Sequence, residues 1–157
     1  MFNVVYFEPE IPFNTGATIR LCANTGSQLH LIEPLAFEMD DKRLRRAGLD
    51  YHEYVNVKTW PDYDNFTEKN KGRIYACSTH AGQLYADCHF QPGDSFLFGP
   101  ETRGLPPQIL ERFPDHLAIR IPMSGQGRSL NLANATAVIV YEAWRQNAFA
   151  NGDQERR

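Results

Sequence analysis

The chain has few of the features that mark secreted, membrane or zinc-binding proteins. It has only three cysteines, Cys22, Cys77 and Cys88, and their spacing is never C-x-x-C, which argues against a disulfide framework and a structural zinc site. No run of apolar residues approaches the roughly 18 that a membrane-spanning helix needs. Residues 1–8 carry no basic segment before a short apolar run, so no signal peptide is expected. The sequence therefore predicts a cytoplasmic protein with reduced cysteines.

The chain also lacks an excess of positive charge. The formal net charge is -3 at pH 7, which argues against a protein that coats nucleic acid through a general positive field. Any contact with nucleic acid must then be local. One dense basic cluster, Lys42, Arg43, Arg45 and Arg46, is a candidate for gripping an RNA phosphate backbone. The alternative is a solvated helix face, because Asp41 and Arg45 have the i,i+4 spacing of an ordinary ion pair.

Several catalytic signatures are missing. The chain has no G-x-S-x-G elbow and no H-E-x-x-H pair, and its five histidines are scattered, so hydrolytic or zinc chemistry is not favoured. The segment Gly125–Ser129 lacks both the third glycine of G-x-G-x-x-G and the Lys-Ser/Thr ending of a P-loop. Residues 8–13 stand where an NAD or flavin fingerprint would follow the first strand, which argues against a dinucleotide-binding enzyme.

Strand-like and helix-like segments alternate along the chain. The predicted strands, rich in Val, Ile, Leu, Phe and Tyr, are Asn3–Phe7, Gln28–Ile32, Arg73–Cys77, Ser95–Phe98 and Leu117–Ile121. The predicted helices are Thr15–Asn24, Asp41–Ala47, Asp62–Asn70, Pro107–Arg112 and Leu130–Asn147. This alternation is typical of βαβ units, so we expect an α/β fold with a mostly parallel sheet flanked by helices. Residues 1–150 would form a single domain and 151–157 a polar, flexible tail.

The last predicted helix carries more apolar surface than one core contact needs. One face holds Leu132, Ala135, Ile139 and Ala143 at helical spacing, and Val138, Tyr141 and Trp144 extend beyond that face. Two interpretations remain open. The helix is either buried within its own subunit or shared with a second copy in a dimer, since exposed apolar patches mark interfaces.

Three separated segments combine a strand end, a loop with Gly or Pro, and a helix start. They are Asn14–Arg20, Phe98–Leu105, and Ile119–Met123 leading to Ser129–Ala135. In an open α/β sheet, ligands bind where such loops gather beyond the carboxyl ends of the strands. One ligand could therefore contact all three segments.

The first segment combines a helix start with a cation. Asn14 or Thr15 can cap the helix, Gly16 permits close approach, and Arg20 lies one turn beyond Gly16, where a guanidinium suits a phosphate. The plainer interpretation is an N-cap followed by a surface arginine. In the second segment, Gly and Pro specify a rigid turn but do not explain the charge of Glu101.

The third segment opens the last helix. Ser129 is a natural N-cap for this helix, which is the structural alternative to a role in binding. Asn131 and Asn134 lie on consecutive turns of the predicted helix and are poor interior helix formers. Their amides therefore indicate hydrogen bonding to another group.

Together the three segments resemble the three motifs of the SPOUT superfamily of RNA methyltransferases, in its SpoU/TrmH branch. The resemblance covers about residues 2–146 and is greatest to the minimal single-domain YibK-like (TrmL) subgroup. The matching residues are Asn14, Gly16 and Arg20; Gly99, Glu101 and Gly104; and Ile121, Pro122, Met123, Ser129, Leu130, Asn131 and Ala135. Three motifs in the right order make this resemblance specific.

The resemblance implies 2′-O-methylation of the wobble pyrimidine, cytidine or uridine, in the anticodon loop of tRNA, with S-adenosylmethionine as methyl donor. It also implies a homodimer through the C-terminal helix and a C-terminal trefoil knot, without a metal. The implied cofactor-binding residues are Cys77, Gly99, Ile121, Ser129 and Leu130, and the implied catalytic residues are Arg20, Glu101, Ser129 and Asn131. The alternative is a non-catalytic RNA-binding or ribosome-assembly protein on the same fold, which the presence of all four catalytic residues disfavours.

Overall fold

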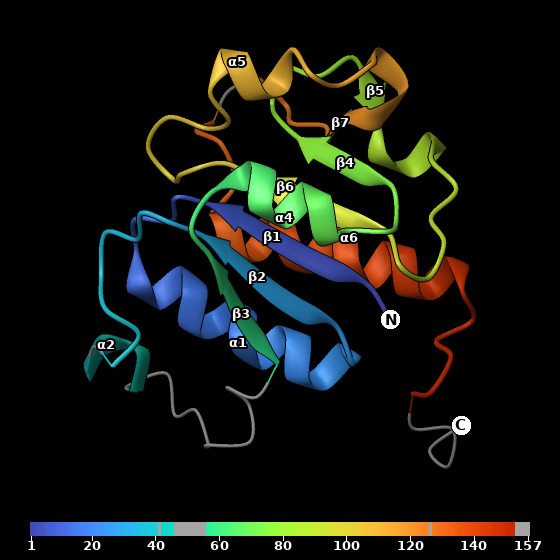
Figure 1. Cartoon of the computed structure of the whole chain (residues 1–157). Coiled ribbons are helices and arrows are strands. Elements are labelled where there is room, and N and C mark those ends of the chain that lie inside the picture. Colours follow the sequence, from blue (N-terminus) through green and yellow to red (C-terminus); the bar gives the residue numbers. More distant parts are fainter. Residues whose placement is uncertain (41, 46–55, 126, 153–157) are drawn as a thin grey trace.

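The computed structural model describes residues 1–40, 42–45, 56–125 and 127–152. Figure 1 shows strands and helices alternating along the chain. The strands are β1 (Asn3–Phe7), β2 (Gln28–Ile32), β3 (Val57–Trp60), β4 (Ile74–Cys77), β5 (Gln83–Leu84), β6 (Ser95–Phe98) and β7 (Ala118–Arg120). The α-helices are α1 (Pro12–Thr25), α2 (Lys42–Arg45), α4 (Tyr63–Lys69), α5 (Pro107–Leu110) and α6 (Leu132–Gln146).

The described strands form one sheet in the order β3-β2-β1-β6-β4-β7-β5, and every pairing in it is parallel. This confirms the predicted α/β class. Two strands escaped the sequence prediction. The edge strand β3 contains two exposed polar residues, Lys58 and Thr59, and β5 is only two residues long. Neither offers the apolar run by which a buried strand is recognised.

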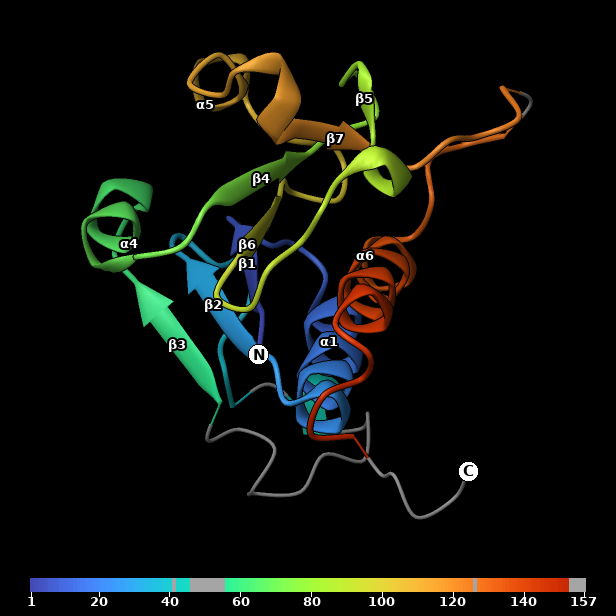
Figure 2. The same cartoon turned by 90° about the vertical axis from the view of Figure 1, so that its right-hand side faces the viewer.

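Helices cover both faces of the sheet. Figure 2 shows α1 and α6 side by side on one face and α4 and α5 on the other. Strands buried on both faces read as continuous apolar runs, as β1 and β6 do after their first residue. Alternate residues of β1 serve different layers: Val4 packs in the cluster with Ile139 of α6, and Val5 packs with Phe66 of α4.

A buried group of hydroxyls joins the sheet to the α1 and α6 layer. The hydroxyl of Tyr6 on β1 lies 2.5 Å from that of Thr18 on α1 and 2.8 Å from that of Thr136 on α6. All three residues are buried, and burial raises the pKa of Tyr6. Since each buried hydroxyl has a hydrogen-bonding partner, the three elements are held together without a desolvation penalty.

The first helix begins earlier than predicted. Its N-cap is Ile11, with Pro12 in the first turn, so the prediction that Asn14 or Thr15 caps it is wrong. Proline is favoured at this position because its missing N–H would have no partner there. Arg20 therefore lies about two turns into α1, beyond the first turn over which the helix dipole acts.

The last helix begins later than predicted. Its N-cap is Asn131, whose side-chain oxygen accepts the backbone N–H groups of Ala133 at 2.9 Å and Asn134 at 3.3 Å. The prediction that Ser129 caps this helix is therefore wrong, because serine and asparagine are comparable caps and local sequence does not choose between them. Of the apolar residues on α6, Ile139 is buried, whereas Val138 and Tyr141 are 36% and 45% exposed.

Candidate active site at the carboxyl ends of the central strands

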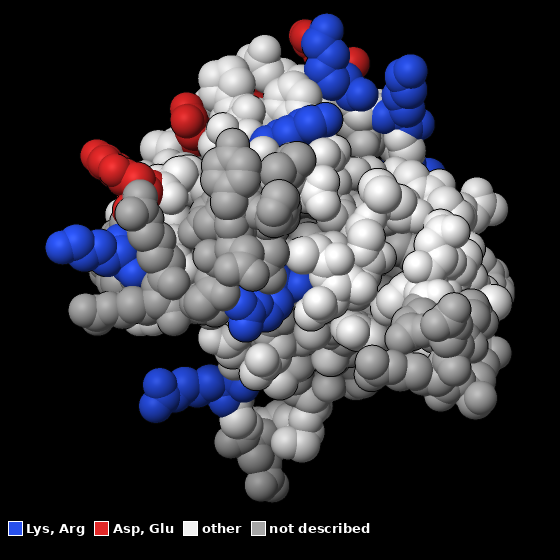
Figure 3. All heavy atoms as spheres, turned by 90° about the horizontal axis from the view of Figure 1, so that it is seen from below, with Lys and Arg blue, Asp and Glu red and all other residues white. Residues whose placement is uncertain are grey.

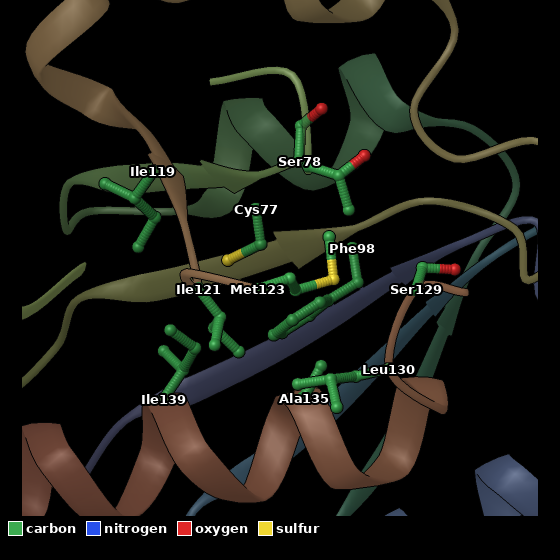
Figure 4. A pocket seen from close by; sticks show the side chains of 11 residues that line it. Cys77, Ser78, Phe98, Ile119, Ile121, Met123, Ser129, Leu130, Ala135 and Ile139 are labelled. Atoms are coloured by element: carbon green, nitrogen blue, oxygen red, sulfur yellow. The ribbon is translucent and has the colours of Figure 1, made fainter. Parts of the chain in front are cut away.

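An apolar pocket lies between the sheet and the start of α6, where β4 and β6 end. Figure 4 shows the side chains of Cys77 and Phe98 on the sheet side and those of Ala135 and Ile139 on the α6 side, all directed into the same space. The pocket encloses about 430 Å³, part of it open to solvent. We call it the apolar pocket.

A wider cleft adjoins the apolar pocket and shares part of its wall. The loops 99–105 and 128–132 line this outer cleft together with Asn14 of α1. Three of the predicted cofactor residues, Cys77, Ser129 and Leu130, line both spaces. Ile121 lines the apolar pocket, and Gly99 lines the outer cleft. The five predicted residues therefore line two adjoining spaces.

Cys77 contributes surface to both spaces rather than a reactive thiolate. Its side chain sits at the end of β4, and burial strongly raises the pKa of the thiol. A thiol that stays protonated is a weak nucleophile. Cys77 therefore acts as a small apolar wall residue.

Gly99 is required by the path of the loop that follows β6. A Cβ atom placed on Gly99 would lie 2.1 Å from the backbone nitrogen of Leu105 and 2.2 Å from the carbonyl carbon of Gly104. No side chain fits at such a distance, so the loop can fold back on itself only with glycine here. The turn closes through Gly104, whose N–H donates to Pro100 O at 2.8 Å and whose φ is 67°.

Glu101 fixes this loop to the start of α1. Its carboxylate accepts the backbone N–H groups of Glu10 at 2.7 Å and Ile11 at 3.0 Å, and the side-chain amide of Asn14 at 3.3 Å. In a capping box, a glutamate within the helix accepts the N–H of the N-cap residue. Here a carboxylate from a distant loop does so, which gives Glu101 a positioning role.

The clamp between the two loops is reciprocal. Glu10 accepts the N–H of Thr102 at 3.1 Å and its hydroxyl at 2.8 Å, and these hydrogen bonds lower the pKa of the Glu10 carboxyl. Arg103 adds an ion pair with Glu8 at 2.8 Å. Sequence reasoning missed Glu8 and Glu10 as partners. The sequence offered one indication of these contacts, which was the complementary charge and hydrogen-bonding capacity of two segments. Glu8 and Glu10 precede the start of α1, and Thr102 and Arg103 follow Glu101.

A chain of amides joins all three motif segments. Asn131 donates its side-chain N–H to the side-chain oxygen Oδ1 of Asn14 at 2.8 Å, and the side-chain amide of Asn14 in turn donates to Glu101. The prediction that the Asn131 amide hydrogen-bonds to another group is confirmed. The link Glu101–Asn14–Asn131 holds the loop after β6, the start of α1 and the start of α6 in one arrangement.

The predicted cations lie away from this link. Arg20 is exposed on α1 and is not among the residues that line the apolar pocket or the outer cleft. Lys42 is exposed at the start of α2, Arg43 and Arg45 belong to that helix, and Arg46 lies outside the described residues. On the face in Figure 3, Lys and Arg side chains stand out at several places, with acidic side chains toward its upper and left edges.

The described residues contain no group of three or more His, Cys, Asp or Glu side chains that could hold a metal ion. Nor do they include a helix of the length and apolarity needed to cross a membrane.

Comparison with known proteins identifies the family. The profile of the SpoU rRNA Methylase family matches residues 1–141. The chain belongs to this family. A tRNA (cytidine(34)-2'-O)-methyltransferase of Aeromonas hydrophila is 55% identical over 156 residues, which cover 99% of this chain and 100% of the relative. The SpoU family, predicted from the resemblance of the three segments, is thereby confirmed.

Solved structures of the family share the fold. One, from a study of the 2-OH methylation of C/U34 on tRNA, has a TM-score of 0.87 and 43% identity, over 94% of this chain and 97% of that chain. Another is the SpoU methyltransferase AviRb from Streptomyces viridochromogenes, solved in complex with AdoMet. It has a TM-score of 0.79 and 25% identity, over 96% of this chain and 58% of that chain.

Proposed function

We propose that this SpoU-family chain transfers a methyl group from S-adenosylmethionine to the ribose 2′-oxygen of the wobble pyrimidine, cytidine or uridine, in the anticodon loop of tRNA. The observation that supports the proposal is that residues of all three motif segments line the outer cleft. The relative that matches along its whole length is named for this reaction. A cytoplasmic location and the trefoil knot are part of the same proposal.

The lining of the apolar pocket suits S-adenosylmethionine. Phe98, Ile121 and Leu130 offer apolar surface to a flat base, and the outer cleft shares Phe98 and Leu130 with the pocket. We assign the holding of the cofactor to Cys77, Gly99, Ile121, Ser129 and Leu130. When bound, S-adenosylmethionine supplies a methyl group on a positively charged sulfur that is a good leaving group.

The protein's part in the reaction is alignment and removal of a proton. The ribose hydroxyl must face the methyl group and lose its proton as it attacks. A guanidinium is a poor proton acceptor, because in proteins it stays protonated and carries no free lone pair. We therefore assign Arg20 to orienting the phosphate beside the reacting ribose, which then helps to take the proton.

Three further residues act by position. Glu101 and Asn131 are joined through Asn14, so they fix the loop after β6 relative to the start of α6. Ser129 lies at the rim that the apolar pocket and the outer cleft share. We assign to these three the alignment of the ribose with the cofactor.

A homodimer would complete the surface around Arg20. On α1, Phe13, Ala17 and Arg20 fall on one exposed stripe at helical spacing, and Phe13 is 53% exposed. On the adjacent α6, Val138 and Tyr141 form another. Two such stripes side by side mark an interface, so we propose a dimer through α6 and α1. Light scattering should give twice the chain mass, and Val138→Asp should give a single chain.

The basic cluster and Arg20 have separable kinetic effects. If Lys42, Arg43, Arg45 and Arg46 contact phosphates, the double variant Arg45→Glu, Arg46→Glu should bind tRNA more weakly and with a flatter salt dependence. Its methylation rate at saturating tRNA should largely recover, since these contacts stabilise ground state and transition state alike. Arg20→Ala should instead lose at least about a hundredfold in that rate.

Single-turnover methylation at saturating tRNA, with tRNA binding measured at several salt concentrations, tests both assignments. Arg20→Ala should still bind S-adenosylmethionine, which calorimetry would measure. An Arg20→Ala protein with a near-normal saturated rate would refute the catalytic assignment. A wild-type chain that binds tRNA but transfers no methyl group would favour the non-catalytic alternative.

A further inference from the structure

Another hollow lies at the amino ends of the strands, opposite the apolar pocket, near the beginnings of β1, β2 and β3. On the sheet face beneath α4, Val5 and Ile32 are apolar and packed in the core. Asn3 precedes Val5 by two positions and His30 precedes Ile32 by two, so both lie on this same face of the sheet, where they line the hollow. Lys58 of β3 pairs with His30 and also lines the hollow. The hollow encloses about 640 Å³, part of it open to solvent.

The lining of this hollow is strongly basic. The chain contains four lysines, and Lys58, Lys69 and Lys71 line this one space. None of the residues that line it is acidic, and none of the three lysines forms an ion pair with another described residue. In a chain of net charge -3, this concentrates positive potential in one concave place. We call it the lysine hollow.

The floor of the lysine hollow is held by a directed chain of hydrogen bonds. The indole N–H of Trp60 donates to His30 Nδ1 at 3.0 Å, so His30 Nε2 carries the hydrogen and donates to Asn3 Oδ1 at 3.2 Å. Asn3 then donates to Gly93 O at 3.2 Å. Burial, and next the charge of Lys58, lower the pKa of His30 to about 4, so its ring is neutral at pH 7. The attraction for an anion therefore comes from the lysines.

The wall that carries Lys69 and Lys71 is also fixed. Between them, Asn70 donates to Gly72 O at 2.7 Å and accepts the hydroxyl of Ser95 at 2.9 Å. A Cβ atom on Gly72 would lie 2.0 Å from Gly93 O, so two backbone segments touch here. The backbone positions of both lysines are thus set before any ligand arrives, which lowers the entropic cost of binding.

We propose that the lysine hollow binds a phosphate group, as a site separate from the apolar pocket. Three ammonium groups on fixed backbone match the charge and the several acceptor oxygens of a phosphate better than those of a monovalent anion. The phosphate could belong to a free nucleotide or to an RNA backbone, since both present the same group.

The two tryptophans of the chain provide a probe with an internal reference. The indole N–H of Trp60 lies in the lysine hollow, whereas that of Trp144 donates to Ala150 O beyond α6. Inorganic phosphate or adenosine monophosphate, titrated into the whole ¹⁵N-labelled protein at constant ionic strength, should shift the Trp60 indole resonance saturably. The Trp144 resonance should stay in place. A Trp60 resonance that does not move, or that moves in step with Trp144, would overturn the proposal.

Charge variants decide whether the lysines are responsible. The triple variant Lys58→Gln, Lys69→Gln, Lys71→Gln should weaken phosphate binding at least about tenfold, a loss of about 1.4 kcal/mol. The triple Lys→Arg variant keeps the charges and should retain binding. Lys42→Gln removes the one lysine outside the hollow and should leave phosphate binding unchanged. Unchanged binding in the triple Gln variant would place the phosphate elsewhere and refute the site.

Competition identifies the source of the phosphate. If the hollow holds an RNA backbone, unmodified tRNA should shift the Trp60 resonance and abolish the further shift by inorganic phosphate. If it holds a free nucleotide, phosphate should shift Trp60 equally in the presence of tRNA. Either result supports the site, and both differ from the absence of any saturable shift.

Discussion

At the carboxyl ends of β1 and β6, the carboxylates of Glu10 and Glu101 are met by N–H and hydroxyl donors of the facing loop. At the amino ends of β1 and β2, the lysines of the lysine hollow form no ion pair with a described residue. The carboxylates of Glu10 and Glu101 fix the shape of the active site. The ammonium groups of the lysine hollow remain available for a ligand. Variants at each edge should therefore differ in whether they change stability or binding.

The largest loss of stability is expected at the carboxyl ends of the strands, in the variant Gly99→Ala. The added methyl group would collide with backbone at Leu105 and Gly104, so the loop must move, at a cost of at least about 3 kcal/mol. Gly104→Ala is the matched control. Its Cβ would meet no atom within 4 Å, and only its φ of 67° is unfavourable, which costs roughly 1–2 kcal/mol.

Thermal unfolding of both variants measures this difference, with calorimetry of S-adenosylmethionine binding alongside it. The Gly99→Ala protein should lose the most stability and the cofactor affinity together. Equal melting temperatures for the two variants would mean that the close approach at Gly99 is not what fixes the loop.

At the amino ends of the strands, the largest change in the free energy of unfolding should come from a change in pH. The folded pKa of His30 is about 4 and its usual value is 6.5, so between these values the unfolded chain binds more protons. The free energy of unfolding should therefore fall as the pH is lowered, by about 2–3 kcal/mol from His30 alone between pH 7 and pH 4.5. His30→Gln, which keeps a donor and an acceptor, should remove that part of the loss.

Urea unfolding at several pH values would measure the slope. The wild type and His30→Gln should differ in slope but have similar m-values, since the surface exposed on unfolding is the same. Identical slopes would show that protonation of His30 does not oppose folding.

The smallest effect separates two carboxylates of the same clamp. Glu101→Gln replaces a charged acceptor of three donors, and hydrogen bonds to charged groups contribute about 1.5–3 kcal/mol. Since one amide oxygen remains, we expect a loss of about 1.5 kcal/mol. Glu10→Gln weakens exposed contacts to a single residue, Thr102, and should cost less than about 1 kcal/mol.

Methylation assays distinguish the two variants further. Because Glu101 also holds Asn14, its loss should lower the rate at saturating tRNA, whereas Glu10→Gln should mainly lower stability. A reversed order in either stability or rate would show that Glu10, not Glu101, is the main support of the site.

Much of the fold was predictable because buried strands and amphipathic helices have local signatures. The runs Asn3–Phe7, Gln28–Ile32 and Ser95–Phe98 were predicted to the residue. The strand β3 was not, since its Lys58 and Thr59 face solvent at a sheet edge. The starts of α1 and α6 were misplaced. Helix α1 follows Ile11, which makes no side-chain cap, and near the start of α6 both Ser129 and Asn131 are residues that can cap a helix.

The site was predictable as a place but not as a network. Strand ends in a parallel sheet point to one edge, which is enough to gather the three segments. The hydrogen bonds of Glu101 to Glu10 and Ile11 join residues about ninety positions apart, and no local pattern encodes them. The lysine hollow was missed for the same reason: Lys58 is separated in sequence from Lys69 and Lys71, and only the sheet brings them to one space.

The link Glu101–Asn14–Asn131 also affects how the protein folds during its synthesis on the ribosome. Helix α1 is among the first elements to be synthesised, yet the carboxylate that accepts the N–H of its N-cap is made 90 residues later. The amide that completes the link comes 117 residues after Asn14. A nascent chain can therefore pair β1 with β2 early but cannot assemble the site until α6 has begun to emerge. Truncated products of interrupted translation would consequently bear sheet and helices, but no working arrangement of the three motif loops.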